Sequence, residues 1–345
     1  MSLNSDSGGP PVRRAAFPLT LILVVVLVVA GASVAGTAAY FELTQSRAPS
    51  GGPGTTAVID DYGRQVTAPT DPARVVVLGP NIVDSMVRLG LRADIVGVDC
   101  SAASYGGLLG DYTTNQTINW SLSPGLCIQA FPSLNTEELL NDSPQLILAT
   151  SFVSESAVNE FSVTYHVPVV WLVPTTLDGI VSDLHLLAQI FPAASGSATL
   201  EAALKTTLAD ANQALANLTS NASAVIPSVL LTYYVDPVAG YYTYGPATYG
   251  DSLLVLAGGR SIAANSSVPY PVLPGSEVLA DNPSVVIYGV GPLGSPYSAY
   301  AQGPNWGQLT ATKVPMDVTL FTEADPTMIL LGLAELTHAL HPGPG

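Results

Sequence analysis

Charge is scarce in this chain of 345 residues, and positive charge is scarcest. Charged residues make up 10% of the sequence, only two of them are lysines, and the formal net charge is −16. Basic residues do not cluster beyond the pair Arg13–Arg14. Because nucleic-acid binding depends on clustered basic side chains that neutralise phosphates, this composition argues against a nucleic-acid partner. A surface with so few ionisable groups also favours an acidic external medium.

Histidine and cysteine are also rare, with four and two copies. Only His338 and His341 have a spacing suited to one metal ion, and two cysteines alone do not complete a structural zinc site. The segment GVGPLG at 289–294 matches a dinucleotide-binding pattern, but the prolines and glycines after it forbid the helix that such a site needs. Walker loops and recognisable pairs of catalytic carboxylates are absent. We therefore expect no metal, no cofactor and no catalytic residue.

The stretch YGDSLLVLAGG at 249–259 contains the nucleophile signature of one class of serine esterases. Ser252 would then need a histidine base that is oriented by an acid. Enzymes with this signature are similar to one another in an Asp-X-X-His pair near the C-terminus, and this chain has no such pair. We interpret Asp251 and Ser252 instead as residues of the first turn of a helix, where both satisfy free backbone N–H groups.

Residues 15–41 form an uncharged, largely apolar run. About 20 such residues in a helix cross a hydrocarbon core of roughly 30 Å. A pair of arginines precedes the run, so the positive-inside rule predicts a cytoplasmic tail at 1–14 and places everything beyond residue 42 outside the cell. The sequence therefore predicts a single-pass protein of the cell membrane with an extracellular domain.

A cleaved signal peptide is the alternative, since the small residues at 30–39 could form a cleavage site. The run is longer than the usual core of a signal peptide, which favours an uncleaved transmembrane anchor. Residues 42–56 are polar and rich in glycine and proline, and they are typical of a flexible tether between membrane and domain.

The cysteines and the glycosylation sequons agree with an external location. Cys100 and Cys127 are the only two cysteines and could form one disulfide outside the cell. Five Asn-X-Ser/Thr sequons lie on the predicted outer side and are candidate glycosylation sites: Asn115, Asn119, Asn217, Asn221 and Asn265.

Short apolar runs alternate with helical patterns over most of the outer part. Runs of the kind that buried strands show occur at 74–79, 95–99, 145–150, 167–173, 228–234 and 284–289. Such alternation indicates parallel sheets that are covered by helices on both faces. Residues 176–224 have two helical patterns with no strand between them. We predict an α/β fold with two doubly wound parallel-sheet lobes, at 57–175 and 225–345, joined by one long helix within this connector.

An internal repeat supports two lobes. Residues 138–148 read ELLNDSPQLIL and residues 277–287 read EVLADNPSVVI. In each copy a short helix ends before a proline that starts the turn into a buried strand. Helix–proline–strand turns also recur without symmetry in α/β proteins, but the matched positions favour a true repeat.

Aromatic residues gather in the second lobe. Six tyrosines fall within residues 232–252, and further aromatic residues follow the strand at 284–289. We expect the strand at 228–234 to end near residue 234 and a loop to lead to a helix that begins near Gly250. Ligands of open α/β sheets bind outside the carboxyl ends of strands, and tyrosine offers a large apolar face with one hydroxyl. Some of these tyrosines would instead cap the core.

The chain resembles the substrate-binding proteins of ABC importers for cobalamin, ferric siderophores and haem over roughly residues 57–342. The segment from VIDDYGRQVTAP to IVGVD is similar to that family's opening, LNTEELLNDSPQLILAT to its leucine–glutamate–proline–strand segment, and YGPATYGDSLLVLAGG to its aromatic loop and helix. EVLADNPSVVIYG repeats the proline–strand motif, and LLGLAELTHALHP resembles the closing helix. The order of these segments carries the resemblance.

This resemblance implies a ligand held in a cleft between two lobes that close only slightly. In the first lobe it implies contacts from Gly79, Pro80, Asn81, Ile82, Tyr105 and Phe152. In the second lobe it implies contacts from Tyr234, Tyr244, Tyr249, Tyr270, Tyr288 and Trp306.

The family also pairs one glutamate on each lobe with arginines of the importer's permease subunits. The position in the first lobe matches Glu137, seven residues before Pro144, and Glu138 stands beside it. In the second lobe Ser276 occupies the equivalent position, and we assign the role to the adjacent Glu277. A solvated helix start, where the helix dipole stabilises a carboxylate by about 0.3–1 kcal/mol, is the alternative explanation.

The ligand class stays open between a corrinoid, a hydroxamate siderophore and haem. No arginine falls in any predicted cleft loop, which argues against a multiply charged anion. Tyrosine could ligate haem iron, so a haem-binding member of the class is one alternative. A structural surface glycoprotein is another; it would explain the anchor and the sequons but not the repeat or the tyrosines.

Overall fold

The computed structural model describes residues 54–100, 110–111, 116–117, 127–194, 196–291 and 294–342, which belong to one compact unit, Ser50–Gly345. The predicted tail and transmembrane span at 1–41 lie outside the described residues, as do most of the tether, Tyr105, Asn115 and Asn119. Among the helices that the structure describes, none combines the length and the apolar character needed to cross a membrane.

The N-terminal lobe is built on five parallel strands in the order β7-β4-β3-β8-β9. All residues of the central strands β3 and β8 are buried, as expected for strands covered on both faces. A hairpin of β1 and β2 precedes the sheet. The strands are β1 (Thr55–Ile59), β2 (Gln65–Pro69), β3 (Val75–Leu78), β4 (Ile95–Asp99), β7 (Cys127–Ile128), β8 (Leu146–Ala149) and β9 (Val169–Trp171). The helices are α2 (Pro80–Arg88), η1 (Arg92–Asp94), α4 (Thr136–Asn141) and α5 (Glu155–Tyr165), and a separate pair of short strands is β5 (Gly110–Asp111) and β6 (Gln116–Thr117).

The C-terminal lobe has a mixed sheet in the order β13-β11-β10-β14-β15, with β12 also paired to β10. β14 is parallel to β10 and β15, whereas β11 is antiparallel to β10 and β13. The strands are β10 (Ser228–Asp236), β11 (Gly240–Thr243), β12 (Arg260–Ser261), β13 (Val272–Leu273), β14 (Val285–Val290) and β15 (Thr312–Asp317). The helices are α8 (Tyr249–Leu256), α9 (Gly275–Asp281), α10 (Tyr297–Ala301), η3 (Trp306–Gln308), α11 (Thr319–Thr322), the π-helical turn η4 (Met328–Gly332) and α12 (Leu333–Leu340).

The expectation of a loop after residue 234 is wrong, because β10 continues to Asp236 and turns into β11. Asp236 accepts hydrogen bonds from the N–H groups of Val238 and Ala239, and Gly240 closes the turn with a φ of 122°. A positive φ of this size favours glycine. The tyrosines of this region therefore stand on paired strands.

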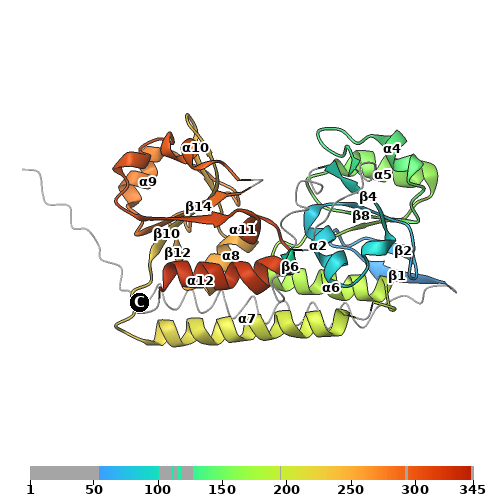
Figure 1. The fold of residues 1–345 in the computed structure, drawn as a ribbon, viewed down its shortest axis with the longest axis horizontal. Helices are drawn as coiled ribbons and strands as arrows, with labels where there is room; N and C mark the ends of the chain where they lie inside the picture. Colours follow the sequence, from blue (N-terminus) through green and yellow to red (C-terminus); the bar gives the residue numbers. More distant parts are fainter. Residues whose placement is uncertain are drawn as a thin grey trace, which may run out of the picture. The chain divides into compact units, whose positions relative to one another are not determined.

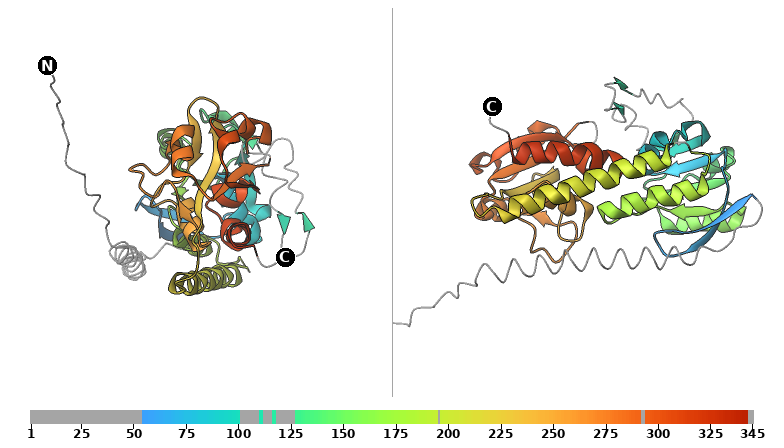
Figure 2. Two further views of the ribbon diagram at one scale, coloured as in Figure 1. Left: turned by 90° about the vertical axis from the view of Figure 1, so that its left-hand side faces the viewer. Right: turned by 90° about the horizontal axis from the view of Figure 1, so that it is seen from below.

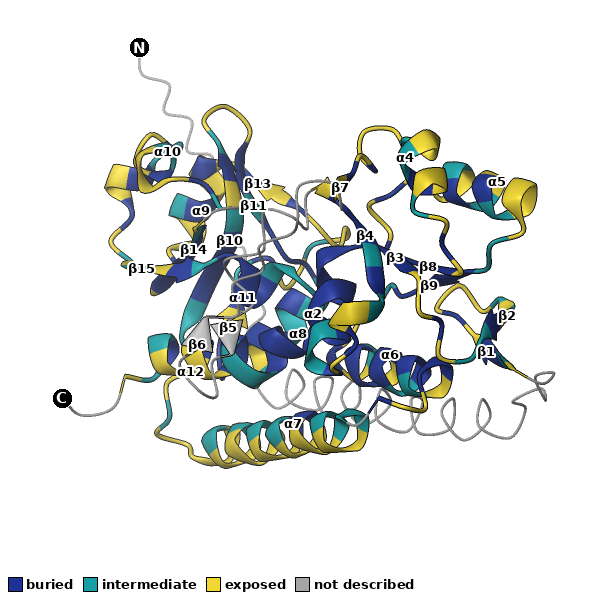
Figure 3. Cartoon of the chain, turned by 45° about the vertical axis from the view of Figure 1, so that its right-hand side comes forward, coloured by how far each residue is buried: buried dark blue, intermediate teal, exposed yellow. Residues whose placement is uncertain are grey.

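Two helices connect the lobes: α6 (Leu177–Ile190) and α7 (Ser197–Ser220). The 24-residue helix α7 contacts α6 as well as α8 and η4 of the C-terminal lobe (Figure 2). It buries only Leu204 and Leu208, and its outer side is exposed (Figure 3). One continuous apolar core, which we call the shared core, includes buried residues of α2, α6, α7, α8 and α12 together with one face of each sheet.

The opposite face of each sheet has a core of its own, which we call the outer core of that lobe. In the N-terminal lobe this core includes Leu139 of α4, and in the C-terminal lobe it includes Val278 of α9. Both side chains are fully buried and occupy matching positions of the sequence repeat. In Figure 1, α4 and α9 lie on the side of their lobes away from α7. The repeat thus corresponds to a repeated structural element.

Candidate functional site

In the N-terminal lobe, the segments that follow β3 and β8 lie against each other. Gly79 follows β3 and leaves no room for a side chain, because a Cβ there would lie 2.7 Å from Thr150 Cγ2 at the end of β8. Two residues further along, the Phe152 ring is 40% exposed. The other predicted contacts of this lobe open α2 and are buried: Pro80, Asn81 and Ile82. Phe152 is therefore the described residue of this group that offers a large surface to a ligand.

Six tyrosines gather around the carboxyl end of β10, and we call them the tyrosine cluster: Tyr233, Tyr234, Tyr242, Tyr244, Tyr249 and Tyr270. Neighbouring ring centroids are 5.1 to 6.2 Å apart, within the range of attractive aromatic pairs. Tyr244 lies at the centre of the cluster and is 3% exposed. At its edges the rings of Tyr234 and Tyr270 are 47% and 48% exposed. The cluster thus has a packed centre and two open edges.

The backbone explains how adjacent tyrosines serve one cluster. Tyr234 and Tyr242 are partners in the antiparallel pair β10–β11, and the register shifts between Thr232 and Tyr234. The Thr232 hydroxyl lies 2.9 Å from the carbonyl oxygens of both Tyr234 and Tyr242. Such a bulge re-aims side chains, which lets Tyr233 and Tyr234 both contact Tyr242. The sequence analysis did not assign Tyr233 and Tyr242 to the site. The available signal was that each stands in a short strand-like run, Tyr233 beside the assigned Tyr234 and Tyr242 two residues before the assigned Tyr244.

Two close contacts fix the centre of the cluster. Gly250 lies under Tyr244, because a Cβ at this glycine would be 2.5 Å from Tyr244 Cγ. The Tyr249 hydroxyl donates a hydrogen bond of 2.6 Å to the carbonyl oxygen of Thr322, the last residue of α11. The cluster is thereby tied to the segment that follows β15.

Burial holds four phenols of the cluster in their neutral form. Burial raises the pKa of Tyr233 to about 12 and raises the pKa of Tyr244 and Tyr249 well above the usual value. The pKa of Tyr270 is also raised by burial. In the absence of a ligand these four residues therefore offer ring faces and neutral hydroxyl groups.

A buried polar network joins the two lobes at Asp84 of α2. Arg88 Nε donates to both carboxylate oxygens of Asp84, at 3.0 and 2.9 Å. From the C-terminal lobe, the backbone N–H and the hydroxyl of Thr327 donate to the same carboxylate, at 3.3 and 3.0 Å. Nearby, burial and then the charge of Asp84 raise the pKa of Asp325, which accepts a hydrogen bond from Met328 N–H. Sequence analysis did not find this network.

Because this network joins segments that follow strands of both sheets, the carboxyl ends of those strands face the boundary between the lobes. α2 begins two residues after β3 ends, and α11 begins two residues after β15 ends. Thr322 and Thr327 belong to the same short segment; the first accepts from the tyrosine cluster and the second donates to α2. The tyrosine cluster therefore lies beside the boundary between the lobes, at the strand edge where α/β sheets bind ligands.

Tyr288 and Trp306 belong to a separate aromatic group on the other face of the C-terminal sheet. They are 5% and 4% exposed and pack with Tyr241 and Tyr300 in the outer core of this lobe. The rings of Tyr288 and Trp306 meet edge to face at 5.3 Å. The structure does not bring them together with the tyrosine cluster, and their role as ligand contacts stays a prediction.

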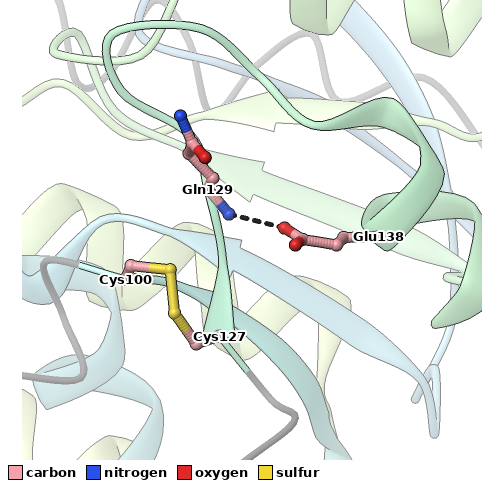
Figure 4. The surroundings of a disulfide bond; sticks show 4 residues. All are labelled: Cys100, Cys127, Gln129 and Glu138. Atoms are coloured by element: carbon pink, nitrogen blue, oxygen red, sulfur yellow. Dashed lines mark hydrogen bonds between the residues drawn. A yellow bond between two sulfur atoms is a disulfide. The ribbon is translucent and has the colours of Figure 1, made fainter.

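The predicted docking glutamates open α4 and α9. Glu137 is exposed, and the side chain of Asn135 caps α4 by accepting from the N–H groups of Glu137 and Glu138. The Glu138 carboxylate is engaged locally, since it accepts from Gln129 N–H at 2.8 Å (Figure 4). Glu277 is exposed in the first turn of α9. Glu137 and Glu277 are therefore the accessible members of the predicted set.

The predicted disulfide is confirmed: Cys100 and Cys127 are bonded (Figure 4). It links the end of β4 to the start of β7. Three of the predicted sequon asparagines lie in the described part of the chain, and all three are exposed: Asn217, Asn221 and Asn265.

Ser252 has the structural role expected for it, with one difference. Its hydroxyl donates to the carbonyl oxygen of Thr248 inside α8. The cap of α8 is Thr248, whose side chain accepts from Asp251 N–H, so Asp251 and Ser252 do not perform the capping. Within the described residues no group of three or more His, Cys, Asp or Glu side chains could hold a metal ion.

A groove of about 510 Å³ lies between α7 and the η4–α12 segment. Its lining is aliphatic and polar and includes Ala211, Leu330 and Leu333, with His338 and His341 at α12. No phenylalanine, tyrosine or tryptophan lines it, and helices rather than strand ends form it. We therefore place the candidate site at the tyrosine cluster and not in this groove.

Comparisons with known proteins agree with this fold. A family model described as "Periplasmic binding protein" matches residues 75–295. Over 233 residues the chain is 27% identical to a cobalamin-binding protein of Halobacterium salinarum, an alignment that covers 67% of this chain and 58% of that protein. Over 222 residues it is 25% identical to a vitamin B12-binding protein of Photorhabdus laumondii, covering 63% and 70%. The chain thus matches little more than half the length of the Halobacterium relative.

Solved structures show the same fold at lower identity. A periplasmic heme-binding protein from Pseudomonas aeruginosa superposes with a TM-score of 0.64 at 20% identity, covering 79% of this chain and 94% of that one. A periplasmic vitamin B12-binding protein of Vibrio cholerae superposes with a TM-score of 0.59 at 17% identity, covering 78% and 97%. At these identities the likeness describes the arrangement of lobes and strands and leaves the ligand open.

Proposed function

Because the chain belongs to the periplasmic binding protein family, whose members are transport components and not enzymes, we propose that it is the substrate-binding protein of an ABC importer. It captures a bulky ligand between its lobes and delivers it to the permease subunits. The observation that carries this proposal is the tyrosine cluster, which stands at the carboxyl edge of the C-terminal sheet beside the lobe boundary. Large ring faces with neutral hydroxyl groups suit a ligand with much apolar surface and a few polar groups.

The ligand proposed first is a corrinoid. The relatives with the highest identities reported above are named for cobalamin or vitamin B12. A ferric hydroxamate siderophore is smaller but also has much apolar surface with a few polar groups, and it is the second candidate. Haem is the third candidate, because a tyrosine of the cluster could ligate its iron.

A binding screen on the full chain in detergent tests this function. The probes are cyanocobalamin, ferrichrome and haem, and the readouts are quenching of intrinsic fluorescence and the shift in melting temperature. A ligand present at about 100 times its Kd stabilises the folded state by about 2.7 kcal/mol, which is a measurable shift. Saturable binding of cyanocobalamin or ferrichrome is the expected result, and silence with all three probes contradicts the proposal.

Alanine variants locate the binding site. In the double variant Tyr234→Ala/Tyr270→Ala, the two open edges of the cluster are lost, and we expect affinity to fall at least about tenfold. Tyr165→Ala is the matched control, because this ring is 45% exposed but lies on α5 against Phe161. Equal affinities for the double variant and the control would place the ligand elsewhere.

Delivery to the importer is proposed to use Glu137 and Glu277, one from each lobe. Both are exposed in the first turn of a helix, on α4 and α9. Uptake of labelled ligand by cells should fall in Glu137→Gln/Glu277→Gln while ligand affinity stays the same. Glu160→Gln on the exposed side of α5 is the control. A double variant with normal uptake would remove this part of the proposal.

The membrane anchor and glycosylation are proposed from the sequence alone. Residues 15–41 would hold the binding domain on the outer surface of the cell membrane. The full chain should then remain in the membrane fraction after a high-salt wash, whereas a soluble mature form would indicate cleavage. A glycan on an exposed sequon should give a mobility shift that deglycosylation and the substitution Asn217→Gln each reduce.

A further inference from the structure

Acidic residues accumulate at the edge of the sheets where the tyrosine cluster lies. Asp236 ends β10 and Asp317 ends β15. Glu323 follows α11 directly, and its negative charge adds to the burial that raises the pKa of Tyr244 and Tyr249. Glu323 is also the residue after Thr322, whose carbonyl oxygen accepts the 2.6 Å hydrogen bond from the Tyr249 hydroxyl, so it lies next to the tyrosine cluster.

Basic residues stand at the amino ends of the strands, on the opposite side of the sheets from the tyrosine cluster. Arg74 comes directly before β3, Arg92 is in the turn before β4, Arg260 opens β12 and Lys313 is the second residue of β15. In a parallel arrangement the amino ends of strands share one edge, which is far from the carboxyl ends. Two other basic residues lie on different elements altogether: Arg64 in the β1–β2 hairpin and Lys205 on α7.

Arg88 is the described basic residue that lies at the lobe boundary, and its charge is already compensated. Both oxygens of Asp84 accept from its Nε, and its Nη2 donates to the Thr327 hydroxyl. Only 16% of its side chain is exposed. A ligand anion would have to displace Asp84 to gain this charge, which would leave a buried carboxylate without its partner.

The segments of the chain between the described ranges add no cation. Residues 101–109, 112–115, 118–126 and 292–293 contain neither lysine nor arginine. The remaining basic residues of the protein precede residue 50: Arg13, Arg14 and Arg47.

From this separation of charges we infer that the site selects its ligand by charge: it accepts a neutral or positively charged corrinoid or hydroxamate and rejects ligands that carry free carboxylates. The inference rests on the proposed function. A buried carboxylate or oxyanion of a ligand needs charge-assisted donors. In the described part of the site Arg88 is such a donor, and it is already bound to Asp84. The tyrosine rings also favour a positively charged ligand, because the negative face of an aromatic ring attracts cations. Glu323 is the residue to which we assign the selection.

Three corrinoids of nearly equal size test the inference on the full chain. Aquocobalamin is cationic at about neutral pH, cyanocobalamin is neutral, and a cyanocobalamin monocarboxylic acid replaces one amide by a carboxylate. Dissociation constants from calorimetric titration at low salt should rise in that order, with the acid at least about tenfold weaker than cyanocobalamin. If the chain binds hydroxamates instead, cationic ferrioxamine B should bind more tightly than neutral ferrichrome.

The variant Glu323→Gln assigns the selection to a residue. It should reduce the preference for aquocobalamin over cyanocobalamin by about 3- to 10-fold. Glu335→Gln, an exposed position on α12, is the control. An unfolded Glu323 variant would show in its melting curve, and the comparison of the three probes on the unaltered chain would still decide the inference.

The outcomes separate the two proposals. Absence of saturable binding by every corrinoid and hydroxamate contradicts the proposed function itself. Binding of cyanocobalamin together with equally tight binding of its carboxylic acid, or of haem, overturns the charge selection and leaves the binding function standing.

Discussion

Asp84→Ala is expected to destabilise the protein more than an ordinary loss of a surface ion pair. The Asp84 side chain is 2% exposed and accepts from Arg88 within α2 and from Thr327 of the other lobe. Its removal leaves the guanidinium of Arg88 largely buried without its counter-charge, and it leaves two donors of Thr327 without this acceptor. Removal of one partner of a buried pair typically costs about 3–5 kcal/mol, against about 0.2–1 kcal/mol for an exposed pair.

Smaller substitutions bracket this value. Thr327→Val keeps the shape of the side chain and removes one hydroxyl, so it should lower the free energy of unfolding by about 1–3 kcal/mol. Because Asp84 and Thr327 belong to one network, the double variant Asp84→Ala/Thr327→Val should lose less unfolding free energy than the sum of the two single variants. The difference, which is the coupling energy, should be about 0.5–3 kcal/mol. Replacement of both charges in Asp84→Leu/Arg88→Met should cost less than Asp84→Ala, since no buried charge remains unpaired.

Urea denaturation can follow each lobe separately. Trp171 is buried in the outer core of the N-terminal lobe and Trp306 in that of the C-terminal lobe. Trp120 is the third tryptophan and is replaced in both reporter variants. The variant that keeps only Trp171 and the variant that keeps only Trp306 should unfold at the same urea concentration when the network is intact and at different concentrations in Asp84→Ala. A loss below about 1 kcal/mol, in the range of an exposed pair, would refute the claim that this network couples the lobes.

Three further perturbations test other parts of the structure. Gly250→Ala places a Cβ 2.5 Å from Tyr244 Cγ, so overpacking should lower the free energy of unfolding by about 1–3 kcal/mol. The same variant should weaken cyanocobalamin binding, and an unchanged affinity in calorimetry would show that Tyr244 does not shape the site. Burial raises the pKa of Asp183 well above its usual value, so its contribution to stability is fully present below the unfolded pKa of about 3.9 and is lost as the pH rises through the folded pKa. The urea midpoint should therefore fall from about pH 4 to neutral pH, and Asp183→Asn should make that fall smaller; an identical pH profile would contradict the assignment. Reduction of the Cys100–Cys127 disulfide, whose partners are 27 residues apart, should lower the free energy of unfolding by about 3.5 kcal/mol, and a urea midpoint unaffected by reductant would contradict this prediction.

The sequence predicted the strands that are buried on both faces, including β9 at one sheet edge, and missed β7, β13 and β15 at the other sheet edges. Runs such as VVVL of β3 are continuous and apolar, so their position follows from composition. β15 was missed because TKVPMD contains a lysine and a proline, which an edge strand tolerates. The hairpin after residue 234 was missed although its Asp-Pro and Gly240 are turn residues.

The aromatic residues show where sequence reasoning about the site reaches its limit. Tyr241 and Tyr242 are adjacent, yet Tyr241 packs in the outer core while Tyr242 joins the tyrosine cluster. Side-chain alternation separates them only once the strand and its bulge are known. Asp84 and Thr327 are 243 residues apart, so no local pattern could connect them. Composition alone could predict the scarcity of cations, but their place at the opposite edge of the sheets came from topology.

Hydrogen–deuterium exchange with and without cyanocobalamin tests the central claim most directly, because it reports where on the chain a ligand acts. If the ligand binds between the lobes at the tyrosine cluster, protection should appear in residues 240–251 and also in residues 79–85 of the other lobe. Protection confined to one lobe, or to the groove between α7 and α12, would contradict the account.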